Sequence, residues 1–329
     1  MTLQKVAKHA GVSVSTASKA LSNGKDISDE TKELVRRAAA ELGYFSEQKK
    51  RKMDNRSGTC PTVALICPEI ISIHYSEYVT FLCRLIEQHG GKASVFITGF
   101  DKDKLNSVIE RCIAENEISA AVCLEVPHYK KTLPFPVVYL ANIPGENSVY
   151  PNITAAILNA IRYMHDMGHR KIGYVGEILT KQKETAFCES METVCGKYNP
   201  DHIFCEEGRF EIIGNNAAEK IINMPAEKRP TALLAAYDEV AYGLMHTLRS
   251  AGIKVPEDVS VMGINDIPMS KFLDTPLTTI RIPTEKAAEC AVDIIMNELS
   301  GKTCKKQTVI LECEIIKRAS VIDISEEKQ

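Results

Sequence analysis

Residues 2–21 read TLQKVAKHAGVSVSTASKAL, and this stretch predicts two short helices joined by a tight turn. Gly11 interrupts the pattern, because glycine ends helices and lets the backbone turn. On both sides of it, apolar residues recur at helical spacing: Leu3, Val6, Ala7, Ala10, Ala17, Ala20 and Leu21. Two helices this short cannot bury a core alone, so a third element is expected.

A third helix is predicted between Ser28 and Gly43. Ser28 suits the position before a helix, and Asp29 and Glu30 suit its first turn, where the helix dipole favours negative charge. An apolar stripe follows at helical spacing: Leu34, Val35, Ala38 and Leu42. The pattern therefore predicts a three-helix unit of the helix-turn-helix type.

Charge favours DNA as the partner of this unit. The same helix spacing also occurs in protein-binding bundles and at the corners of enzymes, so the pattern alone leaves the partner open. Residues 1–56 hold 12 Lys or Arg against 7 Asp or Glu, whereas the other 273 residues hold 28 against 36. The net charge of −3 thus combines a basic head with an acidic body, as expected when only the head meets phosphates.

Three signatures, in this order, resemble those of the LacI/GalR family of bacterial transcription regulators. The first is AGVS at 10–13 followed by STASK at 15–19. The second, within 229–263, contains RPTALLAA, DEVAYG and GIKVPEDVSVMG, and the third is PLTTI at 276–280. The resemblance covers nearly the whole chain. It implies an N-terminal all-α helix-turn-helix domain and an α/β two-lobed, periplasmic-binding-protein-like (type I) body, in which the chain crosses between lobes three times.

The hydrophobic pattern of the body agrees with an α/β fold. Apolar runs at 62–67, 93–98, 120–124 and 137–140 alternate with helical stretches near 76–89 and 102–115. The alternation recurs as a helix at 153–166, strands at 171–175 and 231–236, a helix at 239–251 and a strand at 259–264. Two such units in series predict two lobes with a ligand cleft at the carboxyl ends of their strands.

A linker is expected between head and body. Residues 46–60, SEQKKRKMDNRSGTC, lose apolar periodicity and become cationic. We therefore expect a helix-turn-helix domain at 1–45, a hinge at 46–60 and an effector-binding and dimerisation domain at 61–329. By the family resemblance, lobe 1 comprises about 61–151 and 282–311, including the return of 284–299, and lobe 2 about 152–281 and 312–324.

Other classes of protein find little support. The N-terminus enters an amphipathic helix directly and no apolar run is long enough to span a bilayer, so a cytoplasmic protein without a membrane partner is expected. The eleven cysteines form no C-x-x-C pair, and the eight histidines show no metal-ligand spacing. Nucleotide-binding fingerprints and a G-x-S-x-G motif are missing, so we expect no catalytic residues, no metal and no cofactor.

The resemblance assigns base reading in the major groove to Val14, Ser15 and Lys19. Val14 suits a thymine methyl group, Ser15 is a permissive donor or acceptor, and Lys19 can donate to guanine O6 or N7. Most relatives carry arginine where Lys19 stands, and lysine lacks the planar fork, so discrimination is expected to be softer. Six residues match the phosphate-contacting positions of the family: Thr16, Ser18, Ser22, Ser28, Thr31 and Tyr44. For each hydroxyl, a capping or surface role is an equal alternative.

The hinge departs from the family pattern. In relatives it forms a short helix that enters the minor groove and kinks the DNA with a leucine wedge. Met53 falls at the wedge position, and Lys50 falls where a small alanine usually packs. Minor-groove insertion and a solvated basic linker are therefore equal alternatives.

The effector cleft departs further. The charged contacts of sugar-binding relatives align here with Asn152, Phe187, Tyr237 and Asn265. Aromatic stacking on Tyr237 and Phe187, with neutral hydrogen bonds from the asparagines, suits a carbohydrate derivative or a planar metabolite better than a plain hexose or pentose. Equally, the cleft could be filled by its own side chains, in which case Phe187 belongs to the core.

Together these features predict a DNA-binding transcription regulator that is not an enzyme. We expect a repressor that acts as a homodimer on a pseudo-palindromic operator in double-stranded DNA, because one head covers only half of such a site. A small-molecule effector between the lobes would control it. The main alternative is a ligand-binding module of the same fold with degenerate or effector-independent DNA binding.

Overall fold

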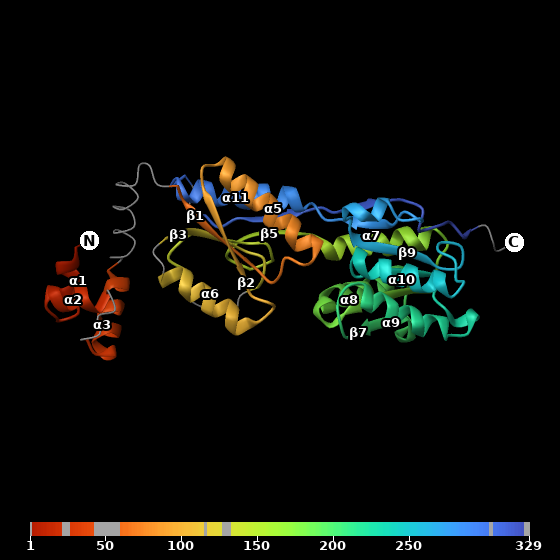
Figure 1. Ribbon diagram of the computed structural model, residues 1–329, viewed down its shortest axis with the longest axis horizontal. Helices are drawn as coiled ribbons and strands as arrows, with labels where there is room; N and C mark the ends of the chain where they lie inside the picture. Colours follow the sequence, from red (N-terminus) through yellow and green to blue (C-terminus); the bar gives the residue numbers. More distant parts are fainter. Residues whose placement is uncertain are drawn as a thin grey trace.

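The computed structural model describes residues 2–21, 27–42, 60–114, 117–126, 133–302 and 305–325 (Figure 1). The head contains α1 (Leu3–His9), α2 (Val14–Leu21) and α3 (Asp29–Glu41). Gly11 adopts a φ of 66° in the turn between α1 and α2, a conformation that glycine accepts without steric cost. These helices enclose a small core of their own: Val6, Ala7, Ala10, Ala17, Ala20, Val35, Ala38 and Ala39.

One predicted core position in the head is wrong. Leu34 is 47% exposed, and Ala39 is buried in the core instead. The core face of α3 is thus lined by Val35, Ala38 and Ala39, because the close approach of three short helices favours small side chains there. The predicted helices themselves are present.

The first sheet of the body is parallel throughout, and we call it and its helices lobe 1. Its strand order is β11-β5-β4-β3-β1-β2. The strands are β1 (Thr62–Cys67), β2 (Lys92–Ile97), β3 (Ile118–Cys123), β4 (Val137–Tyr139), β5 (Asn147–Pro151) and β11 (Thr308–Leu311). Helices α5 (Ile73–Gln88) and α11 (Thr284–Leu299) cover one face, and α6 (Lys102–Ala114) covers the other (Figure 1).

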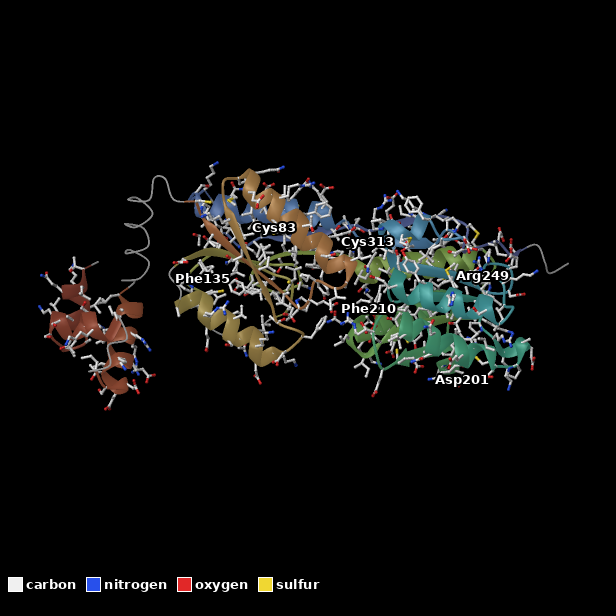
Figure 2. The ribbon with its side chains drawn as sticks, in the orientation of Figure 1. Cys83, Phe135, Asp201, Phe210, Arg249 and Cys313 are labelled. Atoms are coloured by element: carbon white, nitrogen blue, oxygen red, sulfur yellow. The ribbon has the colours of Figure 1, made fainter. Side chains whose placement is uncertain are left out.

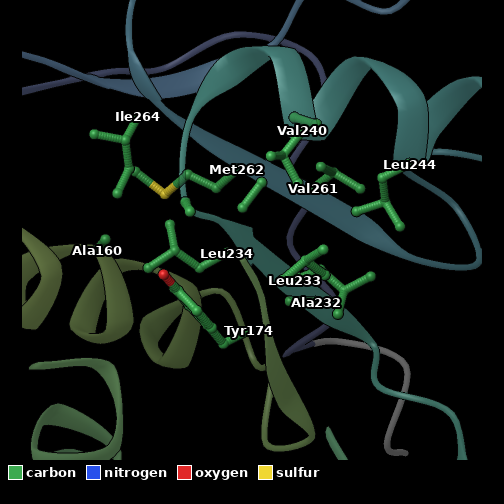
Figure 3. Close-up of a cluster of buried hydrophobic side chains, with 14 of the residues drawn as sticks. Ala160, Tyr174, Ala232, Leu233, Leu234, Val240, Leu244, Val261, Met262 and Ile264 are labelled. Carbon is green, nitrogen blue, oxygen red and sulfur yellow. The ribbon is translucent and has the colours of Figure 1, made fainter. Parts of the chain in front are cut away.

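The second sheet, with its helices, forms lobe 2. Its order is β12-β10-β9-β8-β6-β7, and only β12 runs antiparallel to its neighbour. The strands are β6 (Ile172–Glu177), β7 (Ile203–Glu206), β8 (Ala232–Ala235), β9 (Ser260–Asn265), β10 (Thr278–Arg281) and β12 (Glu314–Ile316). Its helices are α7 (Ile153–Asp166), α8 (Lys181–Cys195), α9 (Glu211–Ile222) and α10 (Asp238–Ser250). Figure 3 shows part of the core, where Tyr174, Leu234 and Met262 lie together.

The chain passes between the two sheets three times, after β5, after β10 and after β11. This arrangement confirms the predicted fold class of a helix-turn-helix head on a two-lobed, periplasmic-binding-protein-like body. The sequence pattern did not identify α8, β7 and α9, the segment of lobe 2 between residues 181 and 222. Within the described residues, none of the helices combines the length and the apolar character needed to cross a bilayer.

The second signature of the sequence packs around the buried carboxylate of Asp238. Its Oδ2 accepts hydrogen bonds from the backbone N–H of Ile267 at 3.0 Å and from the hydroxyl of Ser270, and its Oδ1 accepts one from the hydroxyl of Thr279 at 2.5 Å. A Cβ added at Gly263 would lie 2.2 Å from Asp238 Oδ1, so only glycine fits there. The carboxylate thereby ties the start of α10 to β10 and to the turn after β9.

Candidate DNA-binding face and interlobe cleft

The first candidate site is the exposed face of α2. Val14 is 43% exposed, and Ser15 and Lys19 are exposed as well, whereas Ala17 and Ala20 are buried against the rest of the head. The side chains at the start of α2 and one turn later therefore lie on its outer side. This is the part of a recognition helix that reaches base edges in the major groove.

Three of the predicted phosphate-contacting residues, Thr16, Ser28 and Thr31, take part in hydrogen bonds at helix starts. Ser13 Oγ accepts a hydrogen bond from the backbone N–H of Thr16 at 3.0 Å at the start of α2, and Ser28 Oγ accepts one from that of Thr31 at 3.3 Å at the start of α3. In each pair the two hydroxyl oxygens also lie 2.8 Å apart. Ser28 thus has the capping role predicted for it. Ser18 is exposed on α2, and four other predicted residues lie outside the described part of the chain: Ser22, Tyr44, Lys50 and Met53.

The second candidate site is the place where the two lobes meet, which we call the interlobe cleft, and Arg209 contacts both lobes there. Arg209 follows β7 in lobe 2, and Glu69 follows β1 in lobe 1. The guanidinium donates two hydrogen bonds to Glu69, from Nη1 at 3.1 Å and from Nη2 at 2.7 Å. Arg209 Nε lies 3.0 Å from Oε2 of Glu177, the last residue of β6. A single cation therefore pairs with one carboxylate from each lobe, and its two hydrogen bonds to Glu69 have the bidentate geometry that guanidinium favours.

Aromatic rings flank the same guanidinium. Its central carbon lies 5.1 Å from the ring centre of Phe100 in lobe 1 and 4.7 Å from that of Phe210 in lobe 2, within cation–π range. Both phenylalanines have left-handed backbones, with φ of 61° and 57°, a strained conformation that tends to occur at functional sites. Figure 2 shows Phe210 at the junction of the lobes. Its backbone N–H donates to the hydroxyl of Tyr237 at 3.1 Å.

A second set of interlobe groups lies around the start of α5. The Nζ of Lys183 donates to the carbonyl oxygen of Ala236 at 2.8 Å, and burial lowers the Lys183 pKa to about 8. Burial raises the pKa of Glu239, while the backbone N–H groups of Glu239 itself and of Ile73 in lobe 1 favour its charged form. Burial also lowers the pKa of His74 to about 3, so this imidazole is neutral at physiological pH. Contacts through Glu239 thus join the lobes at a second point.

The four residues predicted to bind the effector have different environments. Asn152 precedes α7 and its Oδ1 accepts from the N–H of Ala155 at 3.3 Å. Phe187 is fully buried in the core of lobe 2, 5.5 Å from the ring of Tyr174, so its ring offers no face to the cleft. Asn265 ends β9 with a φ of 115°. Tyr237 is the one of the four whose contacts, among the described residues, reach the Arg209 cluster.

Sequence reasoning missed the residues that form this cluster. Glu69 lies two residues beyond the predicted strand at 62–67, and carboxyl ends of parallel strands are where ligand contacts gather, so its position was a usable signal. Arg209 follows β7, which the hydrophobic pattern did not reveal. Phe100 and Phe210 carry no periodic signal, because each belongs to a loop.

Comparison with known proteins finds matches for both the head and the body. Residues 2–47 match the family described as bacterial regulatory proteins, lacI family, and residues 161–321 match a periplasmic binding protein-like domain. The chain is 26% identical to the HTH-type transcriptional repressor CytR of Escherichia coli strain K12, over 97% of this chain and 96% of that protein. It is also 26% identical to the HTH-type transcriptional repressor PurR of Vibrio cholerae, over 98% and 99% of the two chains.

A solved structure shows the same fold. The lac repressor dimer bound to operator and the anti-inducer ONPF superimposes with a TM-score of 0.71 at 20% identity, over 98% of this chain and 99% of that one. The likeness covers both the helix-turn-helix head and the two-lobed, periplasmic-binding-protein-like body. The chain is thus similar, over nearly its whole length, to members of the LacI/GalR family of bacterial transcription regulators.

Proposed function

We propose that this regulator represses transcription by binding a pseudo-palindromic operator as a homodimer, and that a small molecule bound between its lobes controls that binding. The observation that carries the proposal is the exposed face of α2, whose Val14, Ser15 and Lys19 are held outward by a core of small residues on the opposite side. Both relatives reported above are named repressors.

The same proposal assigns a role to each segment of the chain. Residues 1–45 read DNA, 46–60 form the hinge, and 61–329 bind the effector and the second subunit. One head contacts only half of a two-fold operator, so pairing through the body doubles the contacts and fixes the spacing of the half-sites. The proposed protein has no catalytic role and acts in the cytoplasm, where its DNA is.

The interlobe cleft is suited to control because an ion pair joins its two sides. Arg209 binds Glu69 across the cleft, and the exposed fractions of the two side chains are 29% and 12%. A ligand that changes this ion pair shifts the relative arrangement of the lobes, and any ligand with different affinities for two arrangements shifts their populations. The same shift would reach the heads through the dimer.

The test is a selection of bound sequences from random DNA with the full chain, followed by gel-shift titrations of the selected site. We expect a two-fold symmetric site, and an affinity that falls steeply between 50 and 200 mM salt, by roughly a thousandfold if about six phosphates are contacted. The control is the chain lacking residues 1–56, which should not bind. An affinity that is flat with salt, or unchanged by the truncation, would contradict a DNA-binding head.

A further inference from the structure

The two lobes contribute equivalent strands to the interlobe cleft. The order β4-β3-β1-β2 of lobe 1 is matched in lobe 2 by β9-β8-β6-β7, so β1 corresponds to β6 and the edge strand β2 corresponds to β7. Each of these two pairs is parallel and is connected through a helix, α5 or α8. Residues that follow these strands at their carboxyl ends therefore occupy corresponding positions in the two lobes.

The lobe 1 half of the cleft consists of Glu69, Phe100 and Tyr75. Glu69 follows β1 and accepts both hydrogen bonds from the guanidinium of Arg209. Phe100 follows β2, and its ring centre lies 5.1 Å from the guanidinium carbon and 6.2 Å from the ring centre of Tyr75. Lobe 1 thus presents a carboxylate and an aromatic ring that is supported by a second ring.

Lobe 2 presents the same three kinds of group at the corresponding positions. Glu177 ends β6, and its Oε2 lies 3.0 Å from Arg209 Nε. Phe210 follows β7, and its ring centre lies 4.7 Å from the guanidinium carbon and 6.0 Å from the ring centre of Tyr237. Together the lobes surround one planar cation with two carboxylates and two aromatic rings, which are the groups that recognise a guanidinium.

The cation in this site belongs to the chain itself. Arg209 directly precedes Phe210, and it lies at the carboxyl ends of the strands, where ligands bind in folds of this kind. Both Phe100 and Phe210 have left-handed backbones, a costly conformation that persists where surrounding contacts compensate for it. The guanidinium supplies such a contact to each ring. Arg209 therefore occupies the place that a bound molecule would take.

The two carboxylates depend on Arg209 to different degrees. Glu177 also faces Lys183 and Tyr237, so it keeps favourable partners if the guanidinium leaves. Within the part of the chain that the structure describes, no second cation pairs with Glu69, whose side chain is 12% exposed. Without Arg209, Glu69 is a poorly hydrated charge, and separation of the lobes hydrates it. Loss of the Arg209 contact therefore favours an open arrangement of the lobes.

We propose that Arg209 acts as an internal ligand: it fills a guanidinium site built from both lobes and keeps the lobes closed before any effector binds. The inference rests on the proposed function, because it states how the interlobe cleft is regulated. An effector that changes the arrangement of the lobes must release Arg209 from Glu69. Operator affinity in the absence of effector is therefore set by this internal contact.

The experiment uses a tryptophan reporter in the full chain, which contains no tryptophan of its own. Phe100→Trp places the reporter against the guanidinium, and tryptophan is the best cation–π partner among the aromatic residues. In this background, Glu69→Lys puts a second cation opposite Arg209. We expect the tryptophan emission to shift to the red, because repulsion separates the lobes and the indole becomes solvated.

The matched control is Glu285→Lys, which makes the same change of charge at a carboxylate whose partner, Arg84, lies in the same lobe. Its emission should equal that of the reporter chain alone. Circular dichroism of each variant checks that the fold is retained. No shift in Glu69→Lys, or an equal shift in Glu285→Lys, would overturn the proposal.

A rescue experiment tests whether the cleft is a guanidinium site. Arg209→Ala in the reporter background should also shift the emission to the red. Guanidinium chloride at about 0.1 M, a concentration that lowers the free energy of unfolding only slightly, should reverse that shift by filling the vacated site. Sodium chloride at the same concentration screens charges equally and should not reverse it. Equal effects of the two salts would contradict a guanidinium site.

Gel-shift titrations on the selected operator separate this inference from the proposed function. Glu69→Lys and Glu285→Lys raise the net charge equally, so a several-fold difference in operator affinity between them, without effector, is expected from lobe opening alone. Equal affinities, with the lobes open by fluorescence, would overturn control of DNA binding by Arg209. If the unmodified chain binds no DNA, the proposed function fails, while the fluorescence result still decides whether Arg209 closes the lobes.

Discussion

The exposed face of α2 presents its side chains to solvent, whereas the charged side chains of the interlobe cleft bind one another. Val14 and Ser15 make no contribution to the core of the head, so they are available to a partner. In the cleft, Glu69, Glu177 and Arg209 already satisfy much of one another's charge. The difference indicates that the head adds binding free energy when DNA arrives, while a ligand in the cleft must exchange one set of contacts for another.

The largest expected effect comes from removing the central cation of the cleft. Arg209→Ala leaves Glu69 and Glu177 partly buried without their partner, so the free energy of unfolding of the body should fall by about 3 kcal/mol. Urea unfolding measures this. Arg249→Ala is the control, because its ion pair with Asp274 is exposed and should contribute less than about 1 kcal/mol. Equal losses would mean that the interlobe pair is no stronger than a surface one.

On the head, Lys19→Ala should cost about 1–3 kcal/mol of binding to the preferred DNA site and relax the preference at one base pair in each half-site. Thr16→Ala should weaken binding to all sequences alike, because its position matches a phosphate contact. Titrations against the selected and a scrambled site distinguish the two. If Lys19→Ala weakens both sites equally, Lys19 contacts phosphate and reads no base.

Lys183 provides a pH test of burial in the cleft. Its folded-state pKa is about 8, below the ordinary lysine value of 10.5, so the folded state releases this proton first as pH rises. Burying the charged ammonium costs stability. That cost is full below pH 8 and disappears as pH rises above the unfolded pKa. Between pH 8 and 9 the free energy of unfolding should therefore rise by about 1 kcal/mol. In Lys183→Met this rise should disappear; an unchanged slope would assign it to other groups.

The smallest effect concerns the caps of the head. Ser28→Ala removes the acceptor for the N–H of Thr31 and should lower head stability by about 0.5–1 kcal/mol, without changing which DNA sequence is preferred. Thermal unfolding and a repeated site selection measure the two quantities. A changed preference would show that Ser28 influences base reading as well as capping.

Local patterns were sufficient for much of the fold and insufficient for the cleft. The strand at 62–67 and the helix at 153–166 were predicted with the bounds that the structure gives, because buried apolar residues repeat within each segment. The segment from 181 to 222 escaped prediction because its helices have weaker apolar periodicity. That segment leads to Arg209, so the central residue of the cleft could not be located.

The sequence by itself determined the helix-turn-helix head, the alternation of strands and helices, and the resemblance to the LacI/GalR family, because each depends on residues close together in the chain. Only the tertiary structure decided what occupies the cleft. Glu69 and Arg209 are 140 positions apart, and nothing in either local sequence specifies the other. Phe187 likewise belongs to the core because of the way α8 packs on β6. Charged and aromatic residues on loops follow no period, so their partners are fixed by the meeting of the two lobes.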